Sequence, residues 1–293
     1  ADALEAVQRQ MAEVYTSWQE DPLDSDRNGR LGMHLSVYGK NSAAEPLYRR
    51  AWILAPNEFR WAYYLGYLAF TGGRTETAID WFEQAQRLNP DYPALGLRLG
   101  RAWYELGDFK RARKALMAVG GSQGLRAAAL YYLGQIDLLD RDYEQAVKRL
   151  RQALVMDPEA SRIHYPLARA YRALGKADQA RHHLALQGSQ MPLLEDPLVQ
   201  ELKALERGAR PYYISAMEQV EQGQYQAAVD SFRLGLERDP DNHNAWISLS
   251  RALYLAGQPE QAKQGLEQVL SRAPNKVLAI FLLAVMSDGA GER

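Results

Sequence analysis

The stretch that decides the fold is residues 59–92, FRWAYYLGYLAFTGGRTETAIDWFEQAQRLNPDY. Apolar and small side chains recur at helical spacing up to Phe70, two glycines follow at 72–73, and the same spacing resumes from Ala78 until Pro90. Side chains three and four positions apart share one face of a helix, and a proline cannot continue the second helix. The stretch therefore predicts two antiparallel helices joined by a short turn.

The same 34-residue unit recurs along the chain, with one slip of 14 residues after Pro192. Position 32 of the unit, counted from the N-terminal half repeat onward, is Pro22, Pro56, Pro90, Gly124, Pro158, Pro192, Pro240 and Pro274. Within each unit position 7 is Leu except at Ser215, position 8 is Gly, Ala or Ser, and position 20 is Ala. Small residues at positions 8 and 20 let the two helices approach closely. A single pair cannot bury its apolar face, so neighbouring pairs must stack.

The pairs Leu65-Gly66, Leu99-Gly100 and Leu133-Gly134, in this 34-residue register, resemble the tetratricopeptide repeat (TPR) family. The resemblance implies an all-α fold, a right-handed α-α superhelical solenoid of about seven helix pairs with partial terminal repeats, or about sixteen helices. It also implies that helix A of each pair lines a concave groove and helix B the outer surface. Two positions depart from the family: its Trp at position 4 occurs only as Trp246, and Ser215 replaces a core Leu.

The repeat register divides the chain into five segments. The prediction is an N-terminal capping helix or half repeat at 1–24, repeats 1–5 at 25–192, a spacer helix at 193–208, repeats 6–7 at 209–276, and a truncated repeat 8 helix with tail at 277–293. Repeat 8 lacks a helix B, so we expect its apolar residues to be covered by a partner, a second copy of the chain or the C-terminal tail. These interface residues are Ile280, Phe281, Leu283, Val285 and Met286.

Catalytic and metal-binding signatures are absent from the sequence. Zero cysteines exclude disulfides, thiolate nucleophiles and Cys-containing metal sites. The five histidines form no H-E-x-x-H pattern, neighbouring His182 and His183 are poor co-ligands of one metal, and no phosphate loop occurs. The sequence predicts a non-enzymatic protein without metal or cofactor.

Three features of the sequence bear on localisation and source. The longest apolar run, residues 277–286, is about half of what a membrane-spanning helix needs, so we expect no transmembrane segment. The chain begins at Ala1 without an initiator methionine, which fits removal of a secretory signal but equally a chain trimmed at its N-terminus. We expect a periplasmic or otherwise exported protein, with the cytoplasm as the alternative. The excess of Arg over Lys, 27 against 8, suggests a bacterial source.

Charge is segregated onto one side of helix A. Positions 2, 5, 6, 9, 12 and 13 face away from the packing side, and in repeats 1–7 they hold nine arginines against three acids, or +6, although the chain carries −1. Ten aromatic residues share this stripe. Tyr and Arg are the side chains that most often anchor interfaces, although about half of the tyrosines could simply pack against the neighbouring helix. The predicted ligand-binding groove consists of Arg60, Tyr63, Tyr67, Phe70, Arg98, Arg101, Tyr104, Tyr131, Gln135, Tyr165, Arg169, Arg172, Tyr213, Arg251 and Tyr254.

These residues predict a scaffold or adaptor that binds an acidic or aromatic protein segment within a larger bacterial assembly. As binding residues, Arg98, Arg101, Arg169 and Arg172 should lack an intramolecular carboxylate partner. The carboxylate clamp of the family uses Lys and Asn where Met33, Arg101 and Gln135 stand here, so that clamp does not carry over. The alternative is a groove for an anionic polysaccharide in an export or cell-envelope machine. Single-stranded RNA is less favoured, because the net charge gives little long-range attraction.

Overall fold

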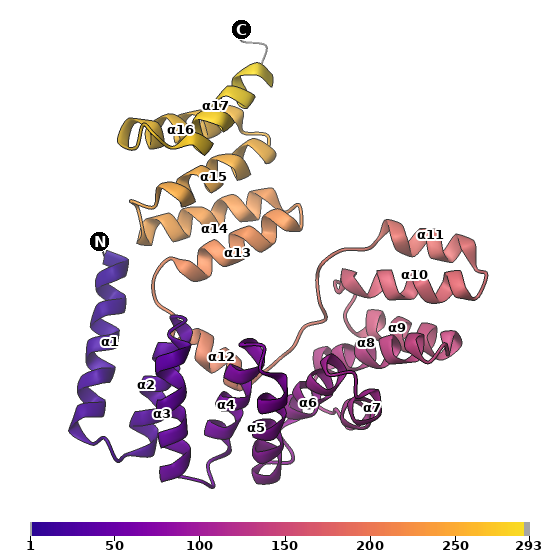
Figure 1. Ribbon diagram of the computed structural model, residues 1–293. Coiled ribbons are helices and arrows are strands. Elements are labelled where there is room, and N and C mark those ends of the chain that lie inside the picture. Colours follow the sequence, from indigo (N-terminus) through magenta and orange to yellow (C-terminus); the bar gives the residue numbers. More distant parts are fainter. Residues whose placement is uncertain (1, 290–293) are drawn as a thin grey trace. The chain divides into compact units, whose positions relative to one another are not determined.

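The computed structural model describes residues 2–289, with side chains from residue 7 to residue 287. Across this range the chain forms seventeen α-helices, one short 3-10 helix and no strand (Figure 1). The predicted all-α class is confirmed, with one α-helix more than the expected sixteen.

Helix contacts divide the chain into two compact units. One unit is Val14–Leu205, and the other combines Ala1–Glu13 with Glu206–Arg293. The helix α1 (Asp2–Glu20) precedes the first pair. The pairs of the first unit are α2 (Ser25–Val37) with α3 (Asn41–Leu54), α4 (Phe59–Thr71) with α5 (Thr75–Leu88), α6 (Pro93–Glu105) with α7 (Phe109–Met117), α8 (Gln123–Leu139) with α9 (Tyr143–Met156), and α10 (His164–Ala173) with α11 (Ala177–Ala185).

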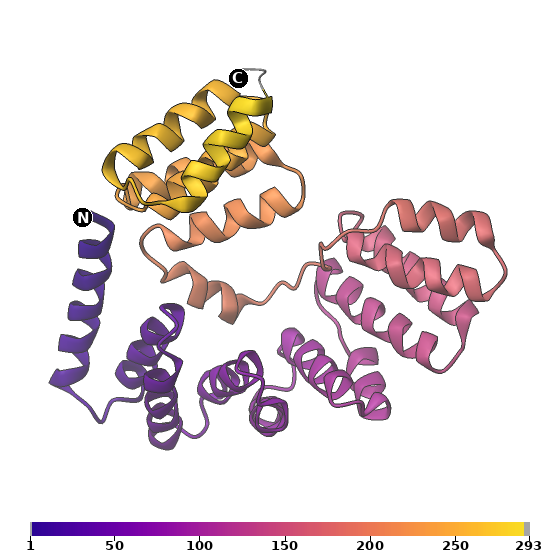
Figure 2. The same cartoon turned by 45° about the horizontal axis from the view of Figure 1, so that its top comes forward.

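Two helices of the first unit lie outside these pairs. The 3-10 helix η1 (Ser161–Ile163) leads directly into α10, and α12 (Pro197–Ala204) follows an irregular stretch after α11. The remaining helices of the chain are α13 (Arg210–Glu221) with α14 (Tyr225–Arg238), α15 (His243–Leu255) with α16 (Pro259–Arg272), and the single helix α17 (Val277–Gly289). Figure 2 shows the same pairs from a second side.

Close approach within each pair depends on the small residue at position 8. A Cβ atom built on Gly66 would lie 2.6 Å from the ring of Phe82, the position 24 residue of the same repeat. Phe82 is itself fully buried. The small residue at position 8 and the large residue at position 24 therefore form the contact between helix A and helix B.

The turn between helix A and helix B takes a left-handed residue in every complete repeat. Glycine occupies this place in six of them, with φ between 72° and 78° at Gly39, Gly73, Gly107, Gly175, Gly223 and Gly257. In repeat 4 the place is taken by Arg141, which has φ of 63°. A side chain in this conformation costs about 1–2 kcal/mol, so repeat 4 carries local strain that the other repeats lack.

The predicted apolar face of repeat 8 is partly exposed. Ile280, Phe281 and Val285 are exposed at 49%, 61% and 46%, whereas Leu283 is half-buried. Met286 is only 3% exposed, because it packs into the core of repeats 6 and 7, so its expected exposure is wrong. The predicted tail after Gly289 lies outside the described residues.

Candidate functional site

Part of the predicted binding stripe is occupied by the chain itself. The short helix α12 packs against the helices A of repeats 1 to 3, which are α2, α4 and α6 (Figure 1). We define the α12 site as the five residues that receive it: Met33, Tyr63, Tyr64, Tyr92 and Arg98.

The centre of the α12 site is the carboxylate of Asp196, the residue that caps α12. Arg98 donates to Asp196 Oδ2 from Nη2 at 2.7 Å and from Nε at 3.1 Å. The Tyr63 hydroxyl donates to the same oxygen, and the Tyr92 hydroxyl donates to Oδ1 at 2.8 Å. Asp196 is 1% exposed and Arg98 is 7% exposed. Both carboxylate oxygens are therefore satisfied by groups from two helices A and the loop before α6.

The protonation states match this role. Burial raises the pKa of Tyr63, and the neighbouring Asp196 carboxylate raises it further. Burial likewise raises the pKa of Tyr92. Both hydroxyls remain protonated at neutral pH and act as donors to the carboxylate.

The backbone and apolar side of α12 are held as well. The Tyr92 hydroxyl accepts from the Leu198 N–H at 3.0 Å, and the Tyr64 hydroxyl donates to the Leu198 carbonyl at 3.0 Å. Leu198, Val199 and Leu202 are buried and belong to the apolar core of repeats 1 to 3. The α12 site therefore recognises a carboxylate, the first turn of a helix and an aliphatic face at once.

Two of the four arginines expected to lack a carboxylate partner are paired. Arg98 pairs with Asp196, and Arg101 Nε lies 3.0 Å from Glu105 Oε1 on the same helix. The expectation is wrong for both, because a one-turn neighbour satisfies Arg101 and a residue 98 positions away satisfies Arg98. Arg60 is also paired, with Asp26 at 3.2 Å.

Three of the eight aromatic residues of the predicted groove are buried. They are Tyr63, Phe70 and Tyr131, and the Tyr131 ring lies 5.2 Å from that of Tyr132. Burial favours the packing explanation for Phe70 and Tyr131, whereas the Tyr63 hydroxyl also donates to Asp196. The other predicted members that are only half-buried are Tyr67, Tyr104, Gln135 and Tyr213.

An open basic surface remains on α10. Tyr165 is 51% exposed, and Arg169 and Arg172 on the next two turns are exposed. Neither arginine forms an ion pair with any carboxylate in the part of the chain that the structure describes. In the other unit, Arg251 and Tyr254 of α15 are exposed as well.

Sequence reasoning missed that the predicted spacer helix fills the α12 site. Asp196, Leu198 and Leu202 lie in the predicted spacer at 193–208, and Tyr92 lies outside the stripe. The available signal was the Asp-Pro start followed by Leu198, Val199 and Leu202 on one helical face, which needs an apolar partner.

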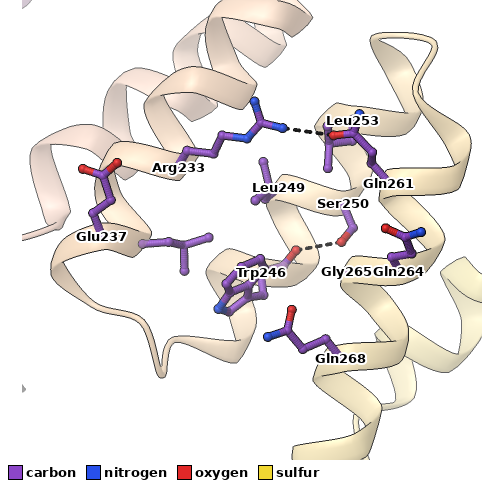
Figure 3. A pocket seen from close by; sticks show the side chains of 11 residues that line it. Arg233, Glu237, Trp246, Leu249, Ser250, Leu253, Gln261, Gln264, Gly265 and Gln268 are labelled. Carbon is purple, nitrogen blue, oxygen red and sulfur yellow. Dashed lines mark hydrogen bonds between the residues drawn. The ribbon is translucent and has the colours of Figure 1, made fainter.

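A separate pocket lies among α14, α15 and α16 (Figure 3). Its volume is about 510 Å³. Trp246 and Leu249 line its apolar part, and Arg233 donates to Gln261 at 3.0 Å along its rim. Gly265 leaves room for the Ser250 hydroxyl, which a Cβ atom would meet at 2.4 Å. None of these residues belongs to the predicted groove.

Histidines of repeat 5 pack together without forming a metal site. His164 Nδ1 lies 2.9 Å from His183 Nδ1, and the His183 ring stacks on Tyr171 at 5.5 Å. Burial, together with neighbouring His164 and His182, lowers the pKa of His183 to about 4. Among the described residues no three His, Cys, Asp or Glu side chains are arranged to hold a metal ion. None of the described helices combines the length and apolar character that a membrane crossing needs.

Comparison with known proteins finds relatives that share the repeats. The chain is 34% identical over 129 residues to the inactive TPR repeat-containing thioredoxin TTL3 of Arabidopsis thaliana, covering 42% of this chain and 17% of that protein. It is 21% identical over 255 residues to human protein O-mannosyl-transferase TMTC1, covering 85% of this chain and 23% of that protein. The chain thus spans less than a quarter of the length of these two curated relatives.

Solved structures share the fold. YrrB, described as a TPR protein with an unusual peptide-binding site, matches with a TM-score of 0.52 and 20% identity over 59% of this chain and 89% of YrrB. MamA matches with a TM-score of 0.51 and 19% identity over 55% of this chain and 88% of MamA. Family models described as tetratricopeptide repeat match residues 31–93, 69–131, 137–205 and 219–282. With these matches over most of its length and its stacked helix pairs, the chain belongs to the tetratricopeptide repeat family.

Proposed function

We propose that this chain is a non-enzymatic scaffold that binds an acidic segment of a protein partner through the open basic surface of α10. The observation that carries the proposal is the pair Arg169 and Arg172, which are exposed beside Tyr165 and lack a carboxylate partner among the described residues. Arginine forks that are already paired, as at Arg60 and Arg101, have less capacity for a ligand.

Neighbouring residues support the same surface. Burial raises the pKa of half-buried Tyr104 on α6, and the positive charge of Arg169 opposes this rise. Rigid aromatic area beside unpaired arginines is typical of interface anchors. The repeats themselves support interaction with proteins, because stacked repeats present an extended binding surface.

Charge reversal tests this proposal. The immobilised full chain captures partners at low salt. The variant Arg169→Glu with Arg172→Glu should capture at most a tenth of the amount of partner that the wild type captures. The matched control reverses Lys148 and Arg151, which lie on α9, the outer helix of the preceding pair. Equal capture by the α10 variant and the wild type would refute the proposal, and equal loss in both variants would indicate a nonspecific charge effect.

An anionic polysaccharide is the alternative ligand that the same arginines would suit. A polyuronate titrated into the full chain tests it directly. Binding that loses nearly all its salt dependence in the α10 variant would favour the polysaccharide, whereas binding of a protein partner that also needs Tyr165 would favour the scaffold.

A further inference from the structure

The position of α12 sets it apart from the other helices of its unit. The helix pairs follow the 34-residue register and pack through positions 8, 20 and 24, whereas α12 belongs to no pair. An irregular stretch from Leu186 to Asp196 precedes it, and non-helical residues follow it. It is therefore placed like a bound peptide rather than like a repeat (Figure 1, Figure 2).

The residues that hold α12 are the ones that a peptide ligand would use. Tyr63 and Arg98 belong to the outward stripe of helix A by register, and the Tyr63 ring also lies 5.7 Å from that of Phe82 on helix B. Arg98 Nη2 and the Tyr92 hydroxyl meet the two oxygens of Asp196 at 2.7 Å and 2.8 Å. Tyr64 meets the Leu198 carbonyl at 3.0 Å. These contacts specify a carboxylate followed within two residues by the first turn of a helix.

The apolar contacts add a second requirement. Leu198, Val199 and Leu202 pack with Met33 and Tyr64 in one core cluster. Positions 200 and 203, which carry Gln200 and Lys203, are exposed. The α12 site thus selects aliphatic side chains at the second, third and sixth positions after the aspartate.

We propose that α12 is a displaceable self-ligand, and that the α12 site binds, from a partner protein, a short helix that starts with Asp-Pro and continues with aliphatic residues in the pattern of Leu198, Val199 and Leu202. Two observations identify this partner helix: Arg98 requires a carboxylate, and α12 itself shows the kind of helix that fits the α12 site. The inference goes beyond the proposed function, because the α12 site shares no residue with the basic surface of α10. Tethering gives α12 an effective concentration in the millimolar range, so a partner helix must either bind more tightly or meet a chain whose α12 has been released.

The test uses a fluorescent peptide of residues 193–205 and the full chain. In the variant Asp196→Ala, Leu198→Ala, Leu202→Ala, the tethered copy loses its anchors while the α12 site stays intact. Anisotropy should show at least a hundredfold tighter peptide binding to this variant than to the wild type. Adding Arg98→Met to the variant, or Asp196→Ala in the peptide, should each weaken that binding at least tenfold.

Two outcomes would overturn the proposal. One is a triple variant that is folded by circular dichroism yet binds the peptide no better than the wild type. The other is equal protection of the α12 and α4 amides in amide exchange of the wild-type chain, because α12 would then be a fixed part of the core. We expect the amides of α12 to exchange at least tenfold faster than those of α4. The exchange measurement decides the question even if the triple variant fails to fold. Neither measurement involves Arg169 or Arg172, so a failed partner capture there leaves this inference separately testable.

Discussion

Replacing Asp196 by Ala should weaken the docking of α12 by about 3–5 kcal/mol, because it strips a buried cation of its carboxylate. Arg98 is 7% exposed, and its Nη2 and Nε both donate to Asp196. Two tyrosine hydroxyls lose their acceptor at the same time. Water can reach Arg98 only if α12 leaves, so the loss should appear as release of α12 before α4 or α6 unfolds.

Amide exchange with mass spectrometry measures this loss locally, and a urea titration followed by circular dichroism checks that the pairs remain folded. The matched control is Glu105→Ala, which removes an exposed partner of Arg101 and should cost no more than about 1 kcal/mol. An apolar replacement of both partners, Asp196→Leu with Arg98→Met, should recover the part of the loss that comes from the buried charge, but not the part from the Tyr63 and Tyr92 hydroxyls. If Asp196→Ala changes the protection of α12 no more than Glu105→Ala does, the assignment of the buried pair is wrong.

Three further predictions concern single repeats. The pKa of His183 is lowered to about 4, whereas an unfolded histidine titrates near 6.5, so the unfolded state binds more protons between these two pH values. The free energy of unfolding should therefore fall by about 1 kcal/mol from pH 6.5 to pH 4, after allowance for solvent screening. In the variant His183→Gln, the urea midpoint should depend less on pH over this range. Arg141→Gly should raise the free energy of unfolding by about 0.5–1 kcal/mol by relieving a left-handed residue, and Gly107→Arg should lower it; equal midpoints for both variants would contradict the strain. Asp137 is 1% exposed and accepts hydrogen bonds from two arginines of neighbouring helices B. The variant Asp137→Ala should therefore lower the free energy of unfolding by about 2–3 kcal/mol in a urea titration. A loss below about 0.5 kcal/mol would show that water replaces the carboxylate.

The fold could be predicted because its information is local. A helix pair is specified within 34 residues, and the small residue at position 8 meets the large residue at position 24 of the same unit, as Gly66 meets Phe82. The repeated register then requires stacking, whatever the rest of the chain does. The all-α class and the helix pairs followed from these positions alone.

The candidate site could be predicted only in part, since its decisive contact is remote in sequence. The stripe included Arg98 and Tyr63, but the carboxylate that neutralises Arg98 lies 98 residues away. No spacing rule links Asp196 to repeat 3, because α12 stands outside the 34-residue register. Within the described part of the chain Arg169 stays unpaired, because α12 covers the repeats at the other end of this unit.

The distance along the chain between α12 and its site also orders the events of synthesis. Tyr63 and Asp196 are 133 residues apart, and Arg98 and Asp196 are 98 residues apart. At a translation rate of about 5–20 residues per second, Arg98 is made about 5–20 s before its carboxylate. Helix pairs of local contacts form far faster than this. For those seconds the nascent repeats 1 to 3 present the α12 site without the helix that fills it in the finished chain, so an external helix would meet no competition from α12 in that interval.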